Sequence, residues 1–311
     1  MTAGAMLVEW VGVVATRIAS VMADLLPITA GMAAVCTGLY FFSSQVCNQG
    51  TPWWRNRGLA TDAWYWLIIP FVAPIIRMLL LISVAMLILP FSTEADIKNY
   101  VEKGFGPLGA LPFWGQVAVY LVISDFFLYW IHRIFHGATM WRFHVIHHSA
   151  EDIDWTTAYR FHPVNLCLGP FLMDVLLLYA GVSPKVLIAM APFQTVTALF
   201  VHANLNWTFG PLKYVIATPV FHRWHHTPLN QGGMKNFAPA FSLWDVLFGT
   251  FYMPQAALPE HYGVDDPRIP QGFFAQLIYP FTRDARPANI GPAGVSASPS
   301  ALGSAQPQRG S

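Results

Sequence analysis

Eight of the eleven histidines form three short clusters between residues 130 and 227. The clusters read His132-Arg-Ile-Phe-His136, His144-Val-Ile-His147-His148 and His222-Arg-Trp-His225-His226. Spacings of three and four residues place side chains on one face of an α-helix, so each cluster can direct two or three imidazoles towards one point. A lone histidine is more often a hydrogen-bonded structural residue than a ligand. Three such clusters in a chain otherwise poor in histidine instead predict metal binding.

The residue types limit which metals and which reactions fit. Neutral imidazoles suit iron, zinc, copper and nickel, whereas magnesium and calcium prefer oxygen ligands. A structural zinc takes four protein ligands, so eight clustered histidines fit two metals better than one. Hydrolysis would need a metal-bound water and usually a carboxylate base, while oxygen chemistry needs a redox metal and electrons.

Composition predicts a membrane protein, because 55% of the residues are hydrophobic and only 11% are charged. A formal net charge of +1 and the absence of a basic block disfavour nucleic-acid binding. The three cysteines are isolated from one another in the sequence and predict neither a disulfide framework nor a thiolate metal site. The N-terminus lacks the pattern of a secretory signal, so we expect it to stay attached.

We predict an all-α fold, a multi-pass transmembrane helical bundle with a cytoplasmic helical cap that carries the histidine-ligated metal site. Residues 1–112 are expected to form N-terminal transmembrane or interfacial helices and a loop. Within them, residues 5–26 carry three charges and suit an interfacial helix as well as a span, residues 28–46 read as a span, and residues 64–89 read as a span kinked by two prolines. The string Gly104-Phe-Gly-Pro-Leu-Gly109 matches a dinucleotide fingerprint, but no strand precedes it, so we reject a cofactor site there.

Residues 113–253 contain the three histidine clusters and are predicted to carry the metal site. A span over residues 113–131 leads directly into the first histidine cluster. Residues 164–201 are expected to form a membrane hairpin of two helices, broken at Gly181-Val-Ser-Pro184. Residues 254–282 are predicted to be an interfacial segment, with a surface helix near 269–281, and residues 283–311 a disordered tail.

The count of spans predicts that all three clusters meet at one membrane surface. No span separates the first two clusters, and the hairpin crosses and returns before His202. The positive-inside rule makes that surface cytoplasmic, because the neighbouring basic residues lie on the same side. They are Arg133, Arg142, Arg160, Lys213, Arg223 and Lys235. The sequence does not distinguish a bacterial inner membrane from the endoplasmic reticulum.

Three further residues near the clusters have competing interpretations. Asp125 lies seven residues before His132, on roughly the same helix face, and is a candidate acceptor for an imidazole N–H. It could equally be a buried carboxylate paired with Arg133 or with a neighbouring helix. His162 precedes a proline that marks a helix start, so we interpret it as structural. His261 lies outside the motifs and is expected to be solvated.

The combined motif resembles the fatty acid hydroxylase superfamily, also called the sterol desaturase family, over about residues 113–253. The resemblance rests on the order of the three clusters and on four flanking segments, which are Asp125-Phe-Phe-Leu-Tyr-Trp-Ile-His-Arg133, Arg160-Phe-His-Pro163, Val201-His-Ala-Asn204 and Phe221-His-Arg-Trp-His-His-Thr227. It implies a membrane-embedded non-haem diiron oxygenase that uses O2 and two external electrons to hydroxylate or desaturate a lipid. The iron ligands that it implies are His132, His136, His144, His147, His148, His202, His222, His225 and His226.

The sequence departs from this family at one point. Related proteins often carry a carboxylate after Arg-x-His-Pro, whereas Val164 and Asn165 follow the proline here. A charged supporting residue is therefore not expected at this position, and Arg160 is interpreted as structural or interfacial, like His162.

The flanks show no haem-binding or reductase domain, so we expect a separate electron-donor protein on the cytoplasmic face and a lipid substrate in the membrane. Arg133, Arg142 and Arg223 could receive an acidic donor, although ordinary interfacial arginines are the simpler interpretation. Lipid hydroxylation is the main hypothesis and desaturation at the same site is the alternative. A metal or proton transporter is disfavoured because its histidines would lie mid-span, and ligand number disfavours a structural zinc protein. The sequence leaves the oligomeric state and the substrate open among sterols, alkylglycerols, carotenoids, fatty acyl groups and amino-acid-containing lipids.

Overall fold

The computed structural model describes residues 3–47, 51–88, 93–254 and 258–285. Every regular element in these ranges is a helix or a helical turn, and no strand occurs among them. This confirms the predicted all-α class. The predicted disordered tail falls outside the described residues from position 286 onward.

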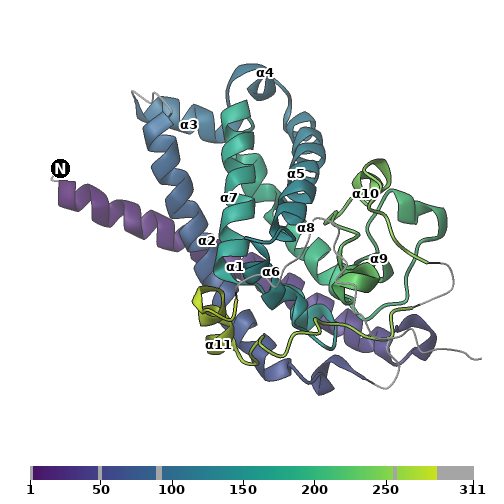
Figure 1. The fold of residues 1–311 in the computed structure, drawn as a ribbon. Helices are drawn as coiled ribbons and strands as arrows, with labels where there is room; N and C mark the ends of the chain where they lie inside the picture. Colours follow the sequence, from purple (N-terminus) through teal and green to yellow (C-terminus); the bar gives the residue numbers. More distant parts are fainter. Residues whose placement is uncertain (1–2, 48–50, 89–92, 255–257, 286–311) are drawn as a thin grey trace, which may run out of the picture.

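Within the described ranges, four helices are long and apolar enough to cross a membrane. They are α2 (Leu59–Ile88, with its apolar stretch at Leu59–Val84), α5 (Phe113–Phe135), α7 (Pro163–Ala180) and α8 (Pro184–His202). Figure 1 shows α2, α5 and α7 standing side by side, with α8 packed behind them. Outward-facing leucines and valines such as Leu79, Val122 and Leu176 are exposed, as expected for surfaces that face lipid.

The hairpin of α7 and α8 follows from local sequence signals. Pro163 and Pro184 occupy first-turn positions, where a missing N–H costs nothing, and Ser183 caps α8 by accepting from the backbone N–H of Val186. Gly181 ends α7 with φ of 104°, a conformation that favours glycine. The two helices span residues 163–202, against the predicted hairpin range of 164–201, and their place in a membrane stays a prediction.

The glycine-rich string after α3 (Glu94–Lys103) has a packing role. Gly104 has φ of 76°, and its Cα lies so close to the carbonyl oxygen of Gly181 that a Cβ would not fit. The N–H of Phe105 donates to that same oxygen at 3.1 Å. The string therefore joins α3 and the short α4 (Gly106–Gly109) to the α7–α8 turn.

The first helix differs from the prediction. Residues 5–26 and 28–46 were expected to be separate, but α1 runs continuously through Ala3–Tyr40 with Pro27 inside it. It ends at Tyr40, six residues early, and its apolar part Leu26–Tyr40 is shorter than a membrane span. In Figure 1 it runs across the upright helices, and around Cys36 it packs against α8 and a tryptophan-rich cluster.

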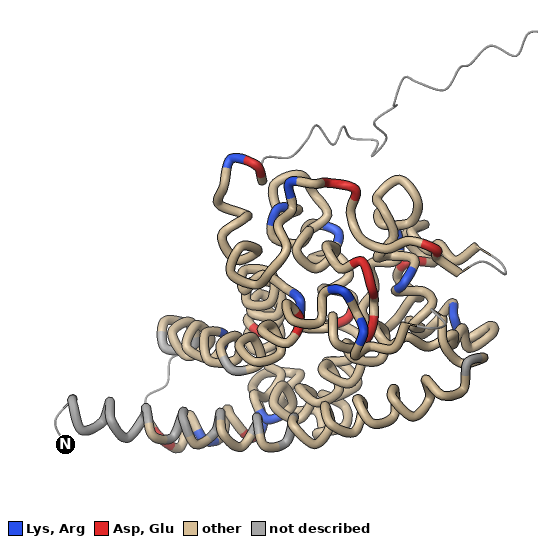
Figure 2. Tube along the Cα trace, turned by 90° about the horizontal axis from the view of Figure 1, so that it is seen from below, with Lys and Arg blue, Asp and Glu red and all other residues tan. Residues whose placement is uncertain are grey.

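The remaining elements form a cap that surrounds one end of the upright helices and extends alongside α5 (Figure 1). They are α6 (Trp141–His148), η3 (Trp155–Tyr159), η4 (Gly210–Tyr214), α9 (Pro219–His225), η5 (Leu229–Gly233), α10 (Leu243–Leu247), α11 (Phe273–Ile278) and η6 (Tyr279–Phe281), together with the short turns η1 (Ser43–Gln45) and η2 (Trp53–Arg55). The expected helix near 269–281 is thus shortened to α11 and η6. Figure 2 shows acidic and basic residues interleaved along the loops of this end.

Candidate metal centre

Nine histidines converge at the junction between the upright helices and the cap. They are His132 and His136 at the end of α5, His144, His147 and His148 on α6, His202 at the last position of α8, and His222, His225 and His226 on or directly after α9. Within each cluster the three- and four-residue spacing turns the rings to one side of a helix. All nine residues that the sequence predicted as ligands therefore lie together.

The nine histidines divide into two groups, each of which could hold a metal ion. The five-histidine group contains His132, His136, His144, His148 and His225, and the four-histidine group contains His147, His202, His222 and His226. Within each group the potential ligand atoms all lie within 4.8 Å of one another. The second and third sequence clusters each contribute to both groups, so neither group corresponds to one sequence motif.

Several rings are oriented by a hydrogen bond from Nδ1, the outer ring nitrogen, to a backbone carbonyl oxygen. The inner nitrogen, Nε2, is directed towards the other histidines. The Nδ1 atoms of His132, His202 and His225 lie 2.7 Å from the carbonyl oxygens of Phe237, Ala198 and Lys235, respectively. A carbonyl only accepts, so the proton sits on Nδ1 and the lone pair sits on Nε2. This is the arrangement by which supporting residues prepare an imidazole to bind a metal.

The inner nitrogens face one another across short distances. The Nε2 atoms of His147 and His202 lie 3.2 Å apart, and both of these rings have their Nδ1 directed at a carbonyl oxygen, that of Arg160 for His147. Two unprotonated nitrogens cannot share a hydrogen bond. A cation shared by the pair would turn this repulsive contact into coordination.

Other ring nitrogens lack any hydrogen-bond partner within the described part of the chain. Both nitrogens of His136 and of His148 are buried in this state, as are Nε2 of His225 and Nδ1 of His226. Leaving a buried polar atom unpaired costs about 1–3 kcal/mol. A cluster of such atoms is therefore better explained by metal coordination than by structural packing, and the donor set fits the metals predicted from the sequence.

Burial keeps the seven histidines outside the candidate spans, which we call the cap histidines, in the neutral form. It lowers the pKa of each ring well below the ordinary value of 6.5, and neighbouring imidazoles lower it further. This holds for His136, His144, His147, His148, His222, His225 and His226. Neutral rings are the form that binds metals, so the centre is in its ligating form at neutral pH.

Of the two interpretations of Asp125, the structure supports a buried carboxylate bonded to a neighbouring element and not an acceptor for an imidazole N–H. The Asp125 carboxylate accepts from the backbone N–H groups of Ala240 and Phe241, both at 2.9 Å, and from the indole N–H of Trp244 at 3.0 Å. It therefore anchors the segment after η5 to α5. Its influence on the centre is indirect, through the carbonyl of Phe237, which lies in the same segment.

Asp245 completes this anchoring from within the segment. Its two carboxylate oxygens accept from the backbone N–H groups of Phe237 and Ala238, each at 2.8 Å, and from the hydroxyl of Thr250 at 2.6 Å. Burial raises the pKa of Asp245, while these bonds partly offset that rise. No role for Asp245 could be predicted from the sequence, because nothing in its spacing indicates which backbone groups it contacts.

Asn165 is a second residue that sequence reasoning missed. Its Oδ1 lies 2.6 Å from Nδ1 of His144 and so orients a ring of the five-histidine group. The position was noted only as a departure from the carboxylate that relatives often carry. The available signal was its place two residues after Pro163, where the start of α7 faces α6.

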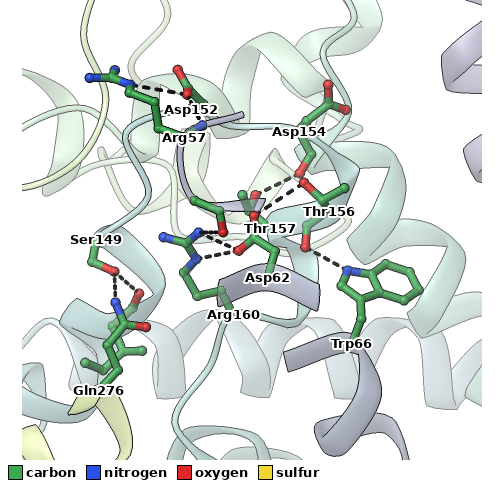
Figure 3. A network of polar contacts seen from close by, with 12 residues as sticks. Arg57, Asp62, Trp66, Ser149, Asp152, Asp154, Thr156, Thr157, Arg160 and Gln276 are labelled. Atoms are coloured by element: carbon green, nitrogen blue, oxygen red, sulfur yellow. Dashed lines mark hydrogen bonds and ion pairs between the residues drawn. The ribbon is translucent and has the colours of Figure 1, made fainter. Parts of the chain in front are cut away.

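Arg160 and His162 make structural contacts, as expected. Arg160 is buried in an ion pair with Asp62 at the start of α2, with Nη2 and Oδ1 2.6 Å apart (Figure 3). His162 caps α7 by accepting from the backbone N–H of Val164, and its other nitrogen donates to the carbonyl of Leu277 at 3.1 Å. These contacts tie the segment between α6 and α7 to α2 and α11.

The structure contradicts a docking role for one of the three arginines that were considered as contacts for an electron donor. Arg223 is fully buried, donates to the carbonyl of Ile153 and lies over the ring of Tyr262 at 5.2 Å, so it cannot receive a partner protein. Arg133 is only partly buried and stacks over Trp130. His261 is exposed and lies outside both histidine groups, as expected.

Comparison with known proteins agrees with this geometry. Residues 117–250, which include all nine histidines, match the family model for fatty acid hydroxylase. The chain is 33% identical over 177 residues to ornithine lipid hydroxylase OlsE of Rhizobium tropici, covering 57% of this chain and 53% of that protein. It is 32% identical to human alkylglycerol monooxygenase, over 44% of this chain and 31% of that one. It is 27% identical to methylsterol monooxygenase 1-1 of Arabidopsis thaliana, over 43% and 46%.

The chain thus spans about half or less of the length of these curated relatives. No solved structure matches it. The family match nevertheless covers the region that builds the two histidine groups. Residues 117–250 thus match the fatty acid hydroxylase family, and the relatives at about one-third identity are lipid hydroxylases or monooxygenases.

Proposed function

We propose that this chain is a membrane-embedded, non-haem diiron oxygenase that hydroxylates a C–H position of a lipid. The observation that carries the proposal is the pair of adjacent, buried, all-histidine groups at the end of an apolar helical bundle. The relatives named above are lipid hydroxylases or monooxygenases, which supports hydroxylation over desaturation. The balanced reaction consumes O2, two electrons and two protons, and converts a lipid C–H into C–OH and one water.

In this proposal each histidine group holds one iron, and the iron pair supplies the reduction of O2 and the oxidation of the C–H bond. The chain supplies neutral nitrogen ligands whose orientation is set by outer bonds such as His132 to Phe237 and His144 to Asn165. Burial of the rings excludes bulk water from the site. The surrounding apolar helices hold the lipid chain so that one carbon faces the centre.

We further propose that the cap faces the cytoplasm and receives electrons there from a separate protein. Support comes from the basic residues at the cap end of the bundle, including Arg133, Arg142, Lys213 and Lys235. With Arg223 buried, Arg133 and Arg142 remain of the three arginines considered for receiving an acidic donor.

The substrate is proposed to be a membrane lipid with a long alkyl or acyl chain. Lipid mass spectrometry of cells that express the wild-type chain or the His147→Ala variant tests this proposal. A +16 Da lipid that appears only with the wild type is the expected result. A −2 Da product would instead indicate desaturation, and identical lipids in both cultures would contradict oxygenase activity on cellular lipids.

A further inference from the structure

One surface of the cap is strongly apolar, although its residues lie outside the helices that could span a membrane. It is formed by residues 209–216, around η4, and residues 242–248, around α10; we call it the apolar platform. Its most exposed side chains are Leu212 at 57% and Leu247 at 62%, flanked by exposed Val215, Ile216, Val246 and Phe248. Apolar side chains gathered in this way normally mark a surface that is covered by something other than water.

The two halves of the apolar platform form one unit. The hydroxyl of Ser242 donates to the carbonyl of Lys213 at 2.7 Å, and the backbone N–H of Ala217 donates to the carbonyl of Ala240 at 2.8 Å. These bonds join segments that lie about thirty residues apart in the sequence. The platform is therefore a built surface rather than two independent loops.

The apolar platform continues the lipid-facing side of α5. The ring of Phe126 lies 5.1 Å from that of Trp244, and the ring of Trp130 lies 5.0 Å from that of Phe248. Phe126 and Trp130 are themselves partly exposed on a helix that can cross a membrane. In Figure 1, α10 stands beside the second half of α5 and not beyond its end. The platform thus shares the depth of residues that would lie in the bilayer.

The charged groups of the apolar platform suit this depth. Asp245 is buried and its carboxylate is fully engaged by Phe237, Ala238 and Thr250. Lys213 lies with its ammonium group 5.2 Å from the centre of the Tyr214 ring, as in a side chain that runs its stem along apolar surface towards the headgroups. No other charged residue occurs in residues 209–216 or 242–248.

We infer that the apolar platform is immersed in the membrane leaflet nearest the metal centre, with lipid acyl chains as its occupant. The platform is linked to the centre through Asp245, which accepts from the backbone N–H of Phe237. The Phe237 ring lies 5.0 Å from that of His136, and its carbonyl oxygen contacts His132. Lateral access of substrate along the platform then follows, and this second statement rests on the proposed oxygenase function.

The immersion can be tested without enzyme turnover. After Cys36, Cys47 and Cys167 are replaced by alanine, a nitroxide label is placed on Leu247→Cys in the full chain, reconstituted in phosphatidylcholine nanodiscs. Label collisions with O2, which concentrates in lipid, are compared with collisions with a water-soluble nickel chelate. Val122→Cys on the exposed face of α5 is the lipid control, and His261→Cys is the water control.

The label at 247 is expected to behave like that at 122, with O2 collisions dominant. A second label at Leu212→Cys should agree, and it decides the question if the first variant misfolds. Nickel accessibility equal to that at 261 would overturn the inference, because the platform would then face water. Protection from both reagents would also overturn it, since protein and not lipid would cover the surface. Either result is independent of whether the protein oxidises a lipid.

Discussion

The two histidine groups of the metal centre are held by different parts of the chain. In the five-histidine group, His132 and His225 donate to the carbonyls of Phe237 and Lys235, behind the apolar platform. In the four-histidine group, the rings of His147 and His202 are directed at carbonyls of the segment before α7 and of α8 itself. A metal that takes about six ligands would keep one more open position in the four-histidine group. The two sites are thus adjacent but separately supported, and they should be separable by mutation.

The largest expected effect is the loss of one ligand from either group. His147→Ala and His225→Ala should each abolish lipid oxidation, because the proposed chemistry needs both irons, while membrane insertion persists. Bound metal should fall by about one per chain in each variant, from a different site. Lipid mass spectrometry with metal analysis checks this. Near wild-type oxidation by either variant would remove that histidine from the ligand set.

A smaller effect on activity, confined to the five-histidine group, is expected when Asn165 is replaced. Asn165→Ala removes the acceptor for Nδ1 of His144 and should lower activity about 10–100-fold, the usual range for a residue that orients a metal ligand. Asn165→Asp is the matched control, because it keeps an acceptor at the same place and should retain most activity. The metal of the four-histidine group should stay bound in both variants. Equal loss from both groups would show that they are not separately supported.

Asp125 should affect the five-histidine group indirectly, because it holds in place the segment that contacts His132. Asp125→Ala leaves three N–H donors without their acceptor, which should destabilise the protein by roughly 1–3 kcal/mol or more and loosen the segment that contacts His132. Chemical unfolding in detergent measures the loss, with Asp125→Asn expected to lie between this variant and the wild type. Unchanged stability of the alanine variant would contradict the anchoring role.

Acid should lower the free energy of unfolding of the metal-free protein. The pKa values of the cap histidines are lowered in the folded state and return to about 6.5 on unfolding. The unfolded chain therefore binds more protons below that pH, and stability falls as pH drops through about 6.5. Thermal unfolding of chelator-treated protein between pH 8 and 5 checks the sign. Stability that rises on acidification would show that the rings are not buried as neutral imidazoles.

No effect is expected at His261, which lies outside both groups. His261→Ala should keep wild-type activity and metal content, so it serves as the reference for the ligand variants. An inactive His261→Ala variant would show that the functional site extends beyond the two histidine groups.

The histidine clusters and the α7–α8 hairpin could be predicted because helical spacing, Gly181 and the first-turn prolines act locally. The division of the ligands into two groups could not, because spacing fixes which rings share a helix face but not how α6 and α9 face each other. Asp125 shows the same limit, since its helix face was known and the donors brought to it by a distant loop were not. Arg223 was misjudged because its charge suggested exposure, whereas Ile153 and Tyr262 accommodate it in the interior.

The central claim is that nine histidines hold two metals in each chain. The most direct measurement is the metal content of the detergent-purified protein from iron-replete cells, handled anaerobically and counted per chain, beside the His202→Ala variant. We predict close to two irons for the wild type and close to one for the variant, which lacks a ligand of the four-histidine group only. No stoichiometric metal in the wild type, or a single metal that His202→Ala leaves in place, would contradict the account.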